Sequence, residues 1–410
     1  MSRVIAAAFV IGLALSHAAG AQVGPPPKAT GSSSGALTRT VLAIDDKKTQ
    51  RNNPTGGETF NLDPVLTLSL DAPPATAAAF DTHSAYVPLR SGSLVAIDLD
   101  AGRIRWQHEM VATQPPAVGD GLLVVAGDEL LSAFDTATGA AKWSVPITGG
   151  FAAPPLLDTG WVVVAATAGD VLVIRAADGK VLWTKSLGVV AVARPFIAGD
   201  GVYLSLSDNR VVALALESGE PRWERTLPGR PGELLVLDDR LFVGADDKYF
   251  YCLNIKHGKN RWRWRTGGKP VGAAAIDEKH VYYIGLDNIL WALDRNGGTL
   301  KWKAQMPVRP SGGPIVLGTV VVVAAVQEEV YGYRIATGAP LGKASYSADL
   351  AAPPQVLAGL SPVLSGIALM TREGDFQILR RRLEPAPIPM PYPLGAEIPV
   401  SALGASTAGS

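Results

Sequence analysis

Catalytic or metal chemistry in this chain would have to come from a small set of residues. Four histidines follow the first 21 residues, and none has the spacing of a metal site. They are His83, His108, His257 and His280. Cys252 is the only cysteine, so an intramolecular disulfide is impossible. These residue types and spacings favour neither metal nor thiol catalysis.

Three cations recur at a fixed position and indicate a binding surface. Arg230, Lys269 and Arg309 each precede a proline and each follow a tryptophan by seven residues. Arg194 also precedes a proline but lies eleven residues after Trp183. If these segments join neighbouring units of one array, the three cations form an arc on one face. The arc could bind an acidic loop of a partner protein or an anionic ligand; a solvated Arg/Lys-Pro loop without function is the alternative.

The elements that position these cations belong to a repeat of about 40 residues. In each copy a small or apolar residue is followed six positions later by glycine and ten positions later by tryptophan. The repeat tryptophans are Trp106, Trp143, Trp183, Trp223, Trp262 and Trp302. The repeat glycines are Gly102, Gly139, Gly179, Gly219, Gly258 and Gly298. A seventh, degenerate copy has Gly342 where the tryptophan would stand.

Each unit is built from strands rather than helices. Residues 93–98 alternate apolar and polar side chains, which is typical of a strand. The segment between Asp98 and Gly102 has turn chemistry, because the carboxylate can accept backbone N–H groups and glycine tolerates positive φ. The tryptophan then opens the next strand, and the small residue ten positions earlier is its packing seat. Forty residues accommodate four such strands, so the sequence predicts the four-stranded antiparallel blades of a β-propeller. The fold class is all-β.

The repeat resembles that of the pyrroloquinoline-quinone (PQQ) type of eight-bladed propellers and, within it, the BamB-type family of outer-membrane protein assembly factors. The likeness covers about residues 64–384 and implies eight blades. We expect residues 66–70 to close the ring as the outer strand of the last blade, whose other strands include 366–370 and 376–379. Closure removes exposed sheet edges.

The termini predict export. A basic start, an apolar run over residues 4–15 and a small-residue cleavage site make residues 1–21 a signal peptide. We expect a flexible polar linker over 22–63, the propeller over 64–384 and a Pro-rich, disordered tail over 385–410. BamB-type proteins carry a lipid-anchoring cysteine at the cleavage boundary, and this chain has none there. The prediction is therefore a periplasmic or secreted protein without a transmembrane segment.

The functional prediction is a non-enzymatic scaffold. The 37 basic and 37 acidic residues balance, which argues against a nucleic-acid partner. The resemblance implies a protein partner in the cell envelope, such as a β-barrel assembly component, with this chain a monomer within the complex. The alternatives are a PQQ-dependent or other redox enzyme and a propeller that binds an anionic ligand or carbohydrate. No cofactor is predicted, because quinoproteins of this type use vicinal cysteines and the chain has one cysteine.

Overall fold

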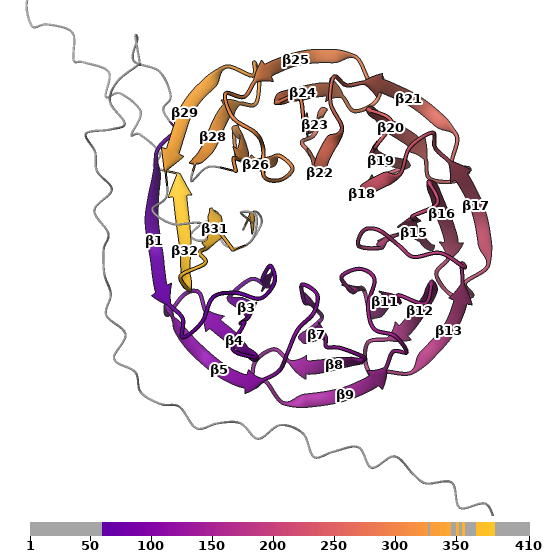
Figure 1. Ribbon diagram of the computed structural model, residues 1–410, viewed down its shortest axis with the longest axis vertical. Coiled ribbons are helices and arrows are strands. Elements are labelled where there is room, and N and C mark those ends of the chain that lie inside the picture. Colours follow the sequence, from indigo (N-terminus) through magenta and orange to yellow (C-terminus); the bar gives the residue numbers. More distant parts are fainter. Residues whose placement is uncertain (1–59, 327–328, 346–349, 352–354, 357–365, 382–410) are drawn as a thin grey trace, which may run out of the picture.

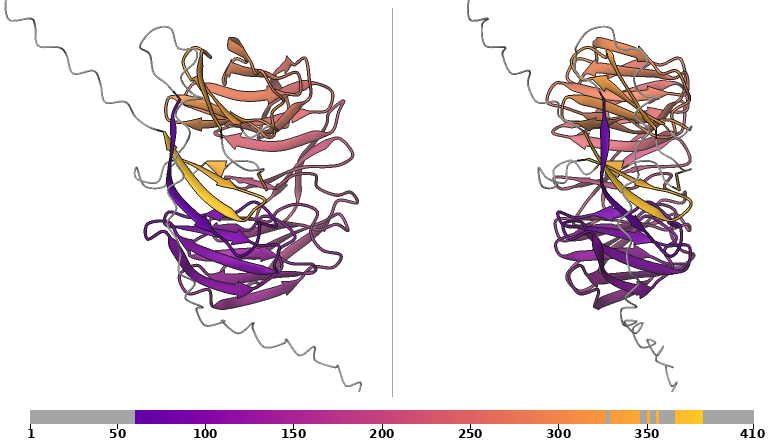
Figure 2. Two further views of the ribbon diagram at one scale, coloured as in Figure 1. Left: turned by 60° about the vertical axis from the view of Figure 1, so that its left-hand side comes forward. Right: turned by 90° about the vertical axis from the view of Figure 1, so that its left-hand side faces the viewer.

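Eight four-stranded antiparallel sheets form a closed ring in the computed structural model (Figure 1). The structure describes residues 60–326, 329–345, 350–351, 355–356 and 366–381. The predicted signal peptide, nearly all of the predicted linker and the predicted tail lie outside these residues. Seen from the side, the ring is a disc (Figure 2). The predicted all-β, eight-bladed propeller is confirmed, and the described residues contain no helix.

The first four blades follow one another along the chain, each running from its inner to its outer strand. Blade 1 consists of β2 (Ala79–Phe80), β3 (Ser84–Pro88), β4 (Ser93–Asp98) and β5 (Arg103–Glu109). Blade 2 consists of β6 (Ala117–Gly119), β7 (Leu122–Ala126), β8 (Leu130–Asp135) and β9 (Ala141–Pro146). Blade 3 consists of β10 (Leu156–Asp158), β11 (Trp161–Ala165), β12 (Asp170–Arg175) and β13 (Val181–Ser186). Blade 4 consists of β14 (Phe196–Ala198), β15 (Gly201–Ser205), β16 (Arg210–Ala215) and β17 (Pro221–Thr226).

The remaining blades keep this order until the last, which takes its outer strand from the N-terminal side of the chain. Blade 5 consists of β18 (Pro231–Leu237), β19 (Arg240–Ala245), β20 (Tyr249–Asn254) and β21 (Asn260–Arg265). Blade 6 consists of β22 (Pro270–Ile276), β23 (His280–Gly285), β24 (Ile289–Asp294) and β25 (Leu300–Gln305). Blade 7 consists of β26 (Ile315–Leu317), β27 (Val320–Ala324), β28 (Glu329–Arg334) and β29 (Pro340–Ser345). Blade 8 consists of β30 (Gln355–Val356), β31 (Ile367–Met370), β32 (Asp375–Arg381) and β1 (Leu62–Ser69).

The hydrophobic core lies between the blades rather than within one centre. Buried apolar residues form eight clusters, and each cluster joins two neighbouring blades, the last joining blade 8 to blade 1. Most of these residues come from the two middle strands of each blade, such as β11 and β12. Because every blade is covered on both faces, its middle strands are continuously apolar instead of alternating.

The repeat tryptophans connect consecutive blades. Each lies on an outer strand opposite the small residue ten positions earlier, as Ala213 pairs with Trp223. The outer strands begin two or three residues before the tryptophan, so the prediction that the tryptophan opens the strand is wrong by that margin. Each indole Nε1 donates to a carbonyl oxygen of the next blade, at distances of 2.6–3.3 Å. The acceptors are Thr136, Ala176, Leu216, Ile255, Arg295 and Ile335.

Strand β1 closes the ring as the sequence predicts. It pairs antiparallel with β32 from Leu62 to Ser69, with one register shift between Pro64 and Leu66, and β1 is the outer strand of blade 8. Phe60, just before β1, is 2% exposed, and its backbone N–H donates to the Leu341 carbonyl oxygen of blade 7 (3.3 Å). Its ring lies against Gly332, the residue paired with Gly342 where the repeat lacks its tryptophan. Phe60 therefore occupies the place of the missing indole.

Candidate functional site

Arg230, Lys269 and Arg309 take equivalent positions in blades 5, 6 and 7. Each is the residue immediately before a proline that pairs with the second strand of its blade. The carbonyl oxygen of each cation accepts a backbone N–H from the hairpin that joins the second and third strands. This shared geometry places all three on the same face of the disc, beside those hairpins.

One carboxylate forms ion pairs with two of the three cations. The Asp246 carboxylate lies 2.6 Å from Lys269 Nζ and 3.5 Å from Arg230 Nε, so it bridges blades 5 and 6. The side chains of Arg230, Lys269 and Asp246 are 51%, 44% and 36% exposed. Surface ion pairs of this kind contribute roughly 0–1 kcal/mol to stability. Arg309 is exposed and has no ion pair among the described residues. The sequence analysis missed Asp246, although it lies sixteen residues after Arg230 in a hairpin that carries two adjacent aspartates.

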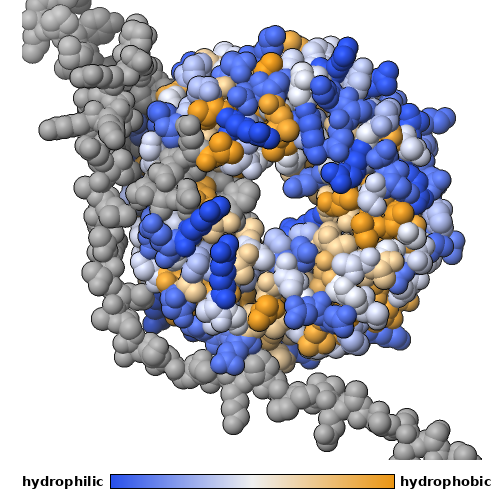
Figure 3. Space-filling model, viewed as in Figure 1, coloured by the Kyte–Doolittle hydropathy of each residue, from blue (hydrophilic) through white to orange (hydrophobic). Residues whose placement is uncertain are grey.

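Arg194 lies apart from this group. It precedes β14, the inner strand of blade 4, and its charge acts on Glu233 in β18, the inner strand of blade 5. Both residues are exposed to solvent, although protein surrounds them. This surrounding protein partly desolvates Glu233 and raises the pKa of its carboxyl, and the charge of Arg194 opposes that rise. The same partial desolvation lowers the pKa of Arg194. Figure 3 shows a central opening, which the inner strands line, and Glu233 belongs to one of these strands. The sequence analysis also missed Glu233, although a charged residue in an otherwise apolar inner strand indicates a functional or paired side chain.

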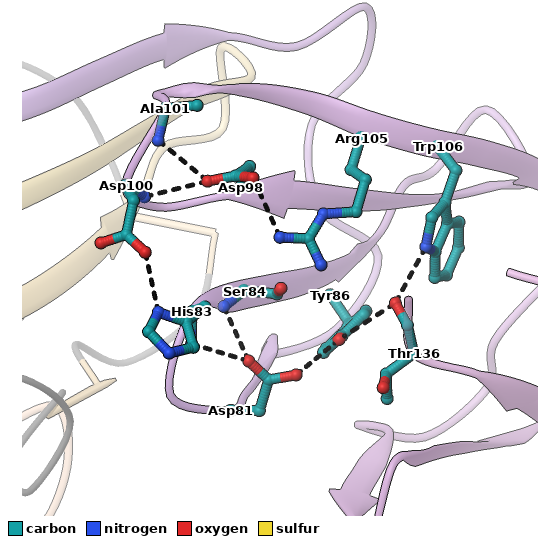
Figure 4. Close-up of polar contacts among 10 residues, drawn as sticks. All are labelled: Asp81, His83, Ser84, Tyr86, Asp98, Asp100, Ala101, Arg105, Trp106 and Thr136. Atoms are coloured by element: carbon teal, nitrogen blue, oxygen red, sulfur yellow. Dashed lines mark hydrogen bonds and ion pairs between the residues drawn. The ribbon is translucent and has the colours of Figure 1, made fainter. Parts of the chain in front are cut away.

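A shallow groove of about 500 Å³ lies between blades 1 and 2. Both oxygens of its Asp81 carboxylate accept hydrogen bonds from within the protein (Figure 4). Asp81 Oδ1 accepts the backbone N–H groups of His83 and Ser84, at 2.9 and 2.7 Å. Tyr86 Oη donates to Asp81 Oδ2 at 2.6 Å. This arrangement fixes the hairpin between the first two strands of blade 1. It leaves the carboxylate with a structural role.

Asp98 and Asp100 have a spacing like that of the first ligands of a calcium-binding loop, but their contacts are structural. Asp98 Oδ1 accepts the backbone N–H groups of Asp100 and Ala101, and its other oxygen accepts from Arg105 at 2.9 Å (Figure 4). The Ala101 N–H and Arg105 hold the pKa of this carboxyl below its usual range. His83 Nδ1 lies 2.7 Å from Asp100. Within the described part of the chain, no group of three or more His, Cys, Asp or Glu side chains is placed to hold a metal ion.

Cys252 is buried and free, as its repeat position predicts. It pairs with Trp262 across β20 and β21, and burial raises the pKa of its thiol to about 12. A thiol held protonated inside a sheet is unreactive. Cys252 is the only cysteine in the sequence, so the vicinal disulfide that the resemblance associates with quinoprotein sites cannot form.

Eight blades, indole contacts from each of blades 1 to 6 to the next blade and an Asp/Asn–Gly turn in most repeats define a β-propeller of the PQQ-repeat class. Within that class, the chain belongs to the family described as outer membrane protein assembly factor BamB. The family model matches residues 90–236 and 232–353. The predicted resemblance is confirmed.

Curated relatives carry the same description. The outer membrane protein assembly factor BamB of Bordetella pertussis is 26% identical over 322 residues, which cover 76% of this chain and 74% of that protein. The protein of that name from Nitrosomonas eutropha is 30% identical over 222 residues, covering 50% and 54%. The one from Burkholderia pseudomallei is 25% identical over 320 residues, covering 72% and 82%.

Solved structures support the fold. BamB from Moraxella catarrhalis superimposes with a TM-score of 0.65 at 19% identity, covering 78% of this chain and all of that one. A quinohemoprotein alcohol dehydrogenase from Pseudomonas putida gives a TM-score of 0.62 at 14% identity, covering 80% and 78%. At such identities the likeness concerns the fold alone. No helix among the described residues is long and apolar enough to cross a membrane.

Proposed function

We propose that this protein is a non-enzymatic scaffold of the cell envelope that takes part in the assembly of outer-membrane proteins. The observation that carries the proposal is the family match across most of the propeller, together with relatives named for that role along its length. In this proposal the protein works in the periplasm as one monomer within a complex, without a cofactor. Its partner is a component of the β-barrel assembly machinery.

The structure suggests how a scaffold would work. A ring closed by β1 is rigid, because each blade packs against two neighbours and the indoles connect blade to blade. A rigid disc holds its hairpins in fixed relative positions, which lowers the entropy lost when a partner binds. We assign partner binding to the face that carries Arg230, Lys269 and Arg309, where cations from three blades lie beside exposed hairpins.

The proposal is tested by reversing the three charges together. Arg230→Glu, Lys269→Glu and Arg309→Glu are combined in one variant and produced in cells that lack the native gene. We expect weaker capture of the barrel-assembly partner and greater sensitivity of the cells to large antibiotics, because the face would repel an acidic partner. Normal capture and normal resistance would contradict the assignment of this face.

A matched control keeps the change in net charge the same. Lys180, Lys256 and Lys259 are exposed and lie in the turns between third and fourth strands, away from the three cations. Changing all three to glutamate should leave partner capture intact. Both variants are first compared with the unaltered protein by urea unfolding, so that a loss of binding is not a loss of fold.

A further inference from the structure

On the proposed binding face, blades 5, 6 and 7 each present a second residue beside the cation. We call it the tip residue: the residue at the hairpin between the second and third strands whose backbone N–H donates to the cation's carbonyl oxygen. Asp246 is the tip residue for Arg230, at 3.0 Å, and Leu286 is that for Lys269, at 2.8 Å. Val326 donates to Arg309 at 3.0 Å. The equivalent backbone bond recurs in blades 1, 3 and 4, where Pro73, Gly150 and Val190 take the cation's place as acceptors. The residues that donate it are the tip residues of those blades.

Blades 6 and 7 differ from those blades at this position. In blades 1, 3 and 4 the tip residues are polar: Arg90, Thr167 and Ser207. Leu286 and Val326 are instead apolar and are 40% and 61% exposed. Scattered single apolar side chains are ordinary on protein surfaces. Leu286 and Val326 are different, because they occupy the same position in adjacent blades. Each is also hydrogen-bonded through the backbone to a cationic residue, so apolar and basic side chains recur together on this surface.

The charges on this surface are uneven. Arg230 and Lys269 share the Asp246 carboxylate, and the same two hairpins also carry Asp247, Lys248 and Asp287, so blades 5 and 6 together keep no excess charge there. The excess positive charge comes from Arg309, which has no ion pair among the described residues and lies next to Val326, the more exposed of the two apolar tips. We name Lys269, Leu286, Arg309 and Val326 the basic–apolar arc.

We propose that the basic–apolar arc binds an extended segment of a partner protein in which carboxylates alternate with branched apolar side chains. The cations would pair with the carboxylates, and Leu286 and Val326 would cover the apolar side chains. The exposed side chains of Leu286 and Val326 favour a segment that also offers apolar side chains over an anionic lipid headgroup, which offers charge alone. This inference rests on the proposed scaffold function and names the chemistry of the partner segment.

The test uses the full-length mature chain and a labelled 14-residue peptide of alternating Asp/Glu and Leu/Val, followed by fluorescence anisotropy. We expect Lys269→Glu with Arg309→Glu to weaken binding at least tenfold. Leu286→Ser with Val326→Ser should weaken it about fivefold without changing its dependence on salt. A peptide with lysine in place of every acid should not bind. The control variant Lys256→Glu with Lys259→Glu changes the net charge by the same amount as the first arc variant and should change binding less than twofold.

Three results would overturn the inference. The peptide could fail to bind the unaltered chain, both arc variants could bind it normally, or phosphatidylglycerol vesicles could bind the arc while the peptide does not compete. Envelope capture of the assembly partner separates this inference from the proposed function. Capture that persists when the peptide fails leaves the scaffold role in place and removes only the segment chemistry. Peptide binding at the arc with no envelope partner supports the segment chemistry and contradicts the scaffold role.

Discussion

At the scale of single residues, the contact between tryptophan and glycine explains why the repeat keeps these two types. Each repeat glycine from the second copy on lies against the indole of the preceding blade, and its φ is positive. At Gly219, φ is +71°, and an added Cβ would lie 2.7 Å from the Trp183 ring. Glycine is therefore required at this position for two reasons: the backbone has a positive φ, and the indole leaves no space for a Cβ.

These two requirements can be separated by measurement. Gly121 has φ +73° and no atom within 4 Å of an added Cβ, so Gly121→Ala tests backbone strain alone. We expect it to cost about 1–2 kcal/mol of unfolding free energy. Gly219→Ala should cost about 1–3 kcal/mol more, since the methyl group also displaces the Trp183 indole. Urea unfolding of both variants decides the point, and equal costs would show that the indole contact is unimportant.

Residue types predicted the repeat better than they predicted the site. The tryptophan, glycine and cation positions can be read along the chain because they recur at fixed spacing. Asp246 joins Arg230 to Lys269 across two blades, and Arg194 acts on Glu233 across two others. Such pairs depend on the radial arrangement of blades, which linear spacing does not contain.

At the scale of elements, the turn between third and fourth strands is the most regular part of each blade. Asp98, Asp135 and Asp294 each accept two backbone N–H groups through Oδ1. Those bonds hold the pKa of each carboxyl below its usual range, with the N–H groups of Ala101, Thr138 and Gly297 as the main causes. Asn254 serves the same turn in blade 5 with a neutral amide oxygen. The turn thus tolerates either side chain.

This difference predicts part of the pH dependence of stability. A carboxyl whose pKa is lower in the folded state stabilises the fold above its unfolded pKa, about 4, and loses that contribution as the pH falls through its folded pKa. Replacing Asp98, Asp135 and Asp294 with asparagine keeps the acceptor and removes the titration. The urea midpoint of this triple variant should fall less between pH 5 and pH 2.5 than that of the unaltered protein. An identical fall would contradict the role assigned to the turns.

At the scale of the whole molecule, closure depends on the segment that leads into β1. The alternating pattern predicted that β1 completes blade 8, and the structure confirms it. The role of Phe60 could not be predicted, because nothing in its local sequence links it to a tryptophan missing 282 positions later at Gly342. Only the closed ring brings the two together. The structure thus places Phe60 and β1 where they hold blades 7 and 8 in register.

Removing that contact should weaken the ring. Phe60→Ala empties the space beside Gly332, and we expect a loss of about 3–5 kcal/mol of unfolding free energy. Val65→Ala in the same strand is the control, because Val65 is 44% exposed and should change stability by less than about 0.5 kcal/mol. Thermal and urea unfolding measure both. If Phe60→Ala were as stable as Val65→Ala, the closure described here would be wrong.

The central claim is that this closed disc acts as a scaffold with a protein partner in outer-membrane assembly. The most direct test is a cross-linked pull-down of the mature protein from native envelope, read by mass spectrometry and by the ultraviolet–visible spectrum of the purified sample. The account predicts a colourless protein that enriches an outer-membrane β-barrel carrying periplasmic domains. A quinone absorbance without a stable protein partner would contradict it and favour a redox enzyme.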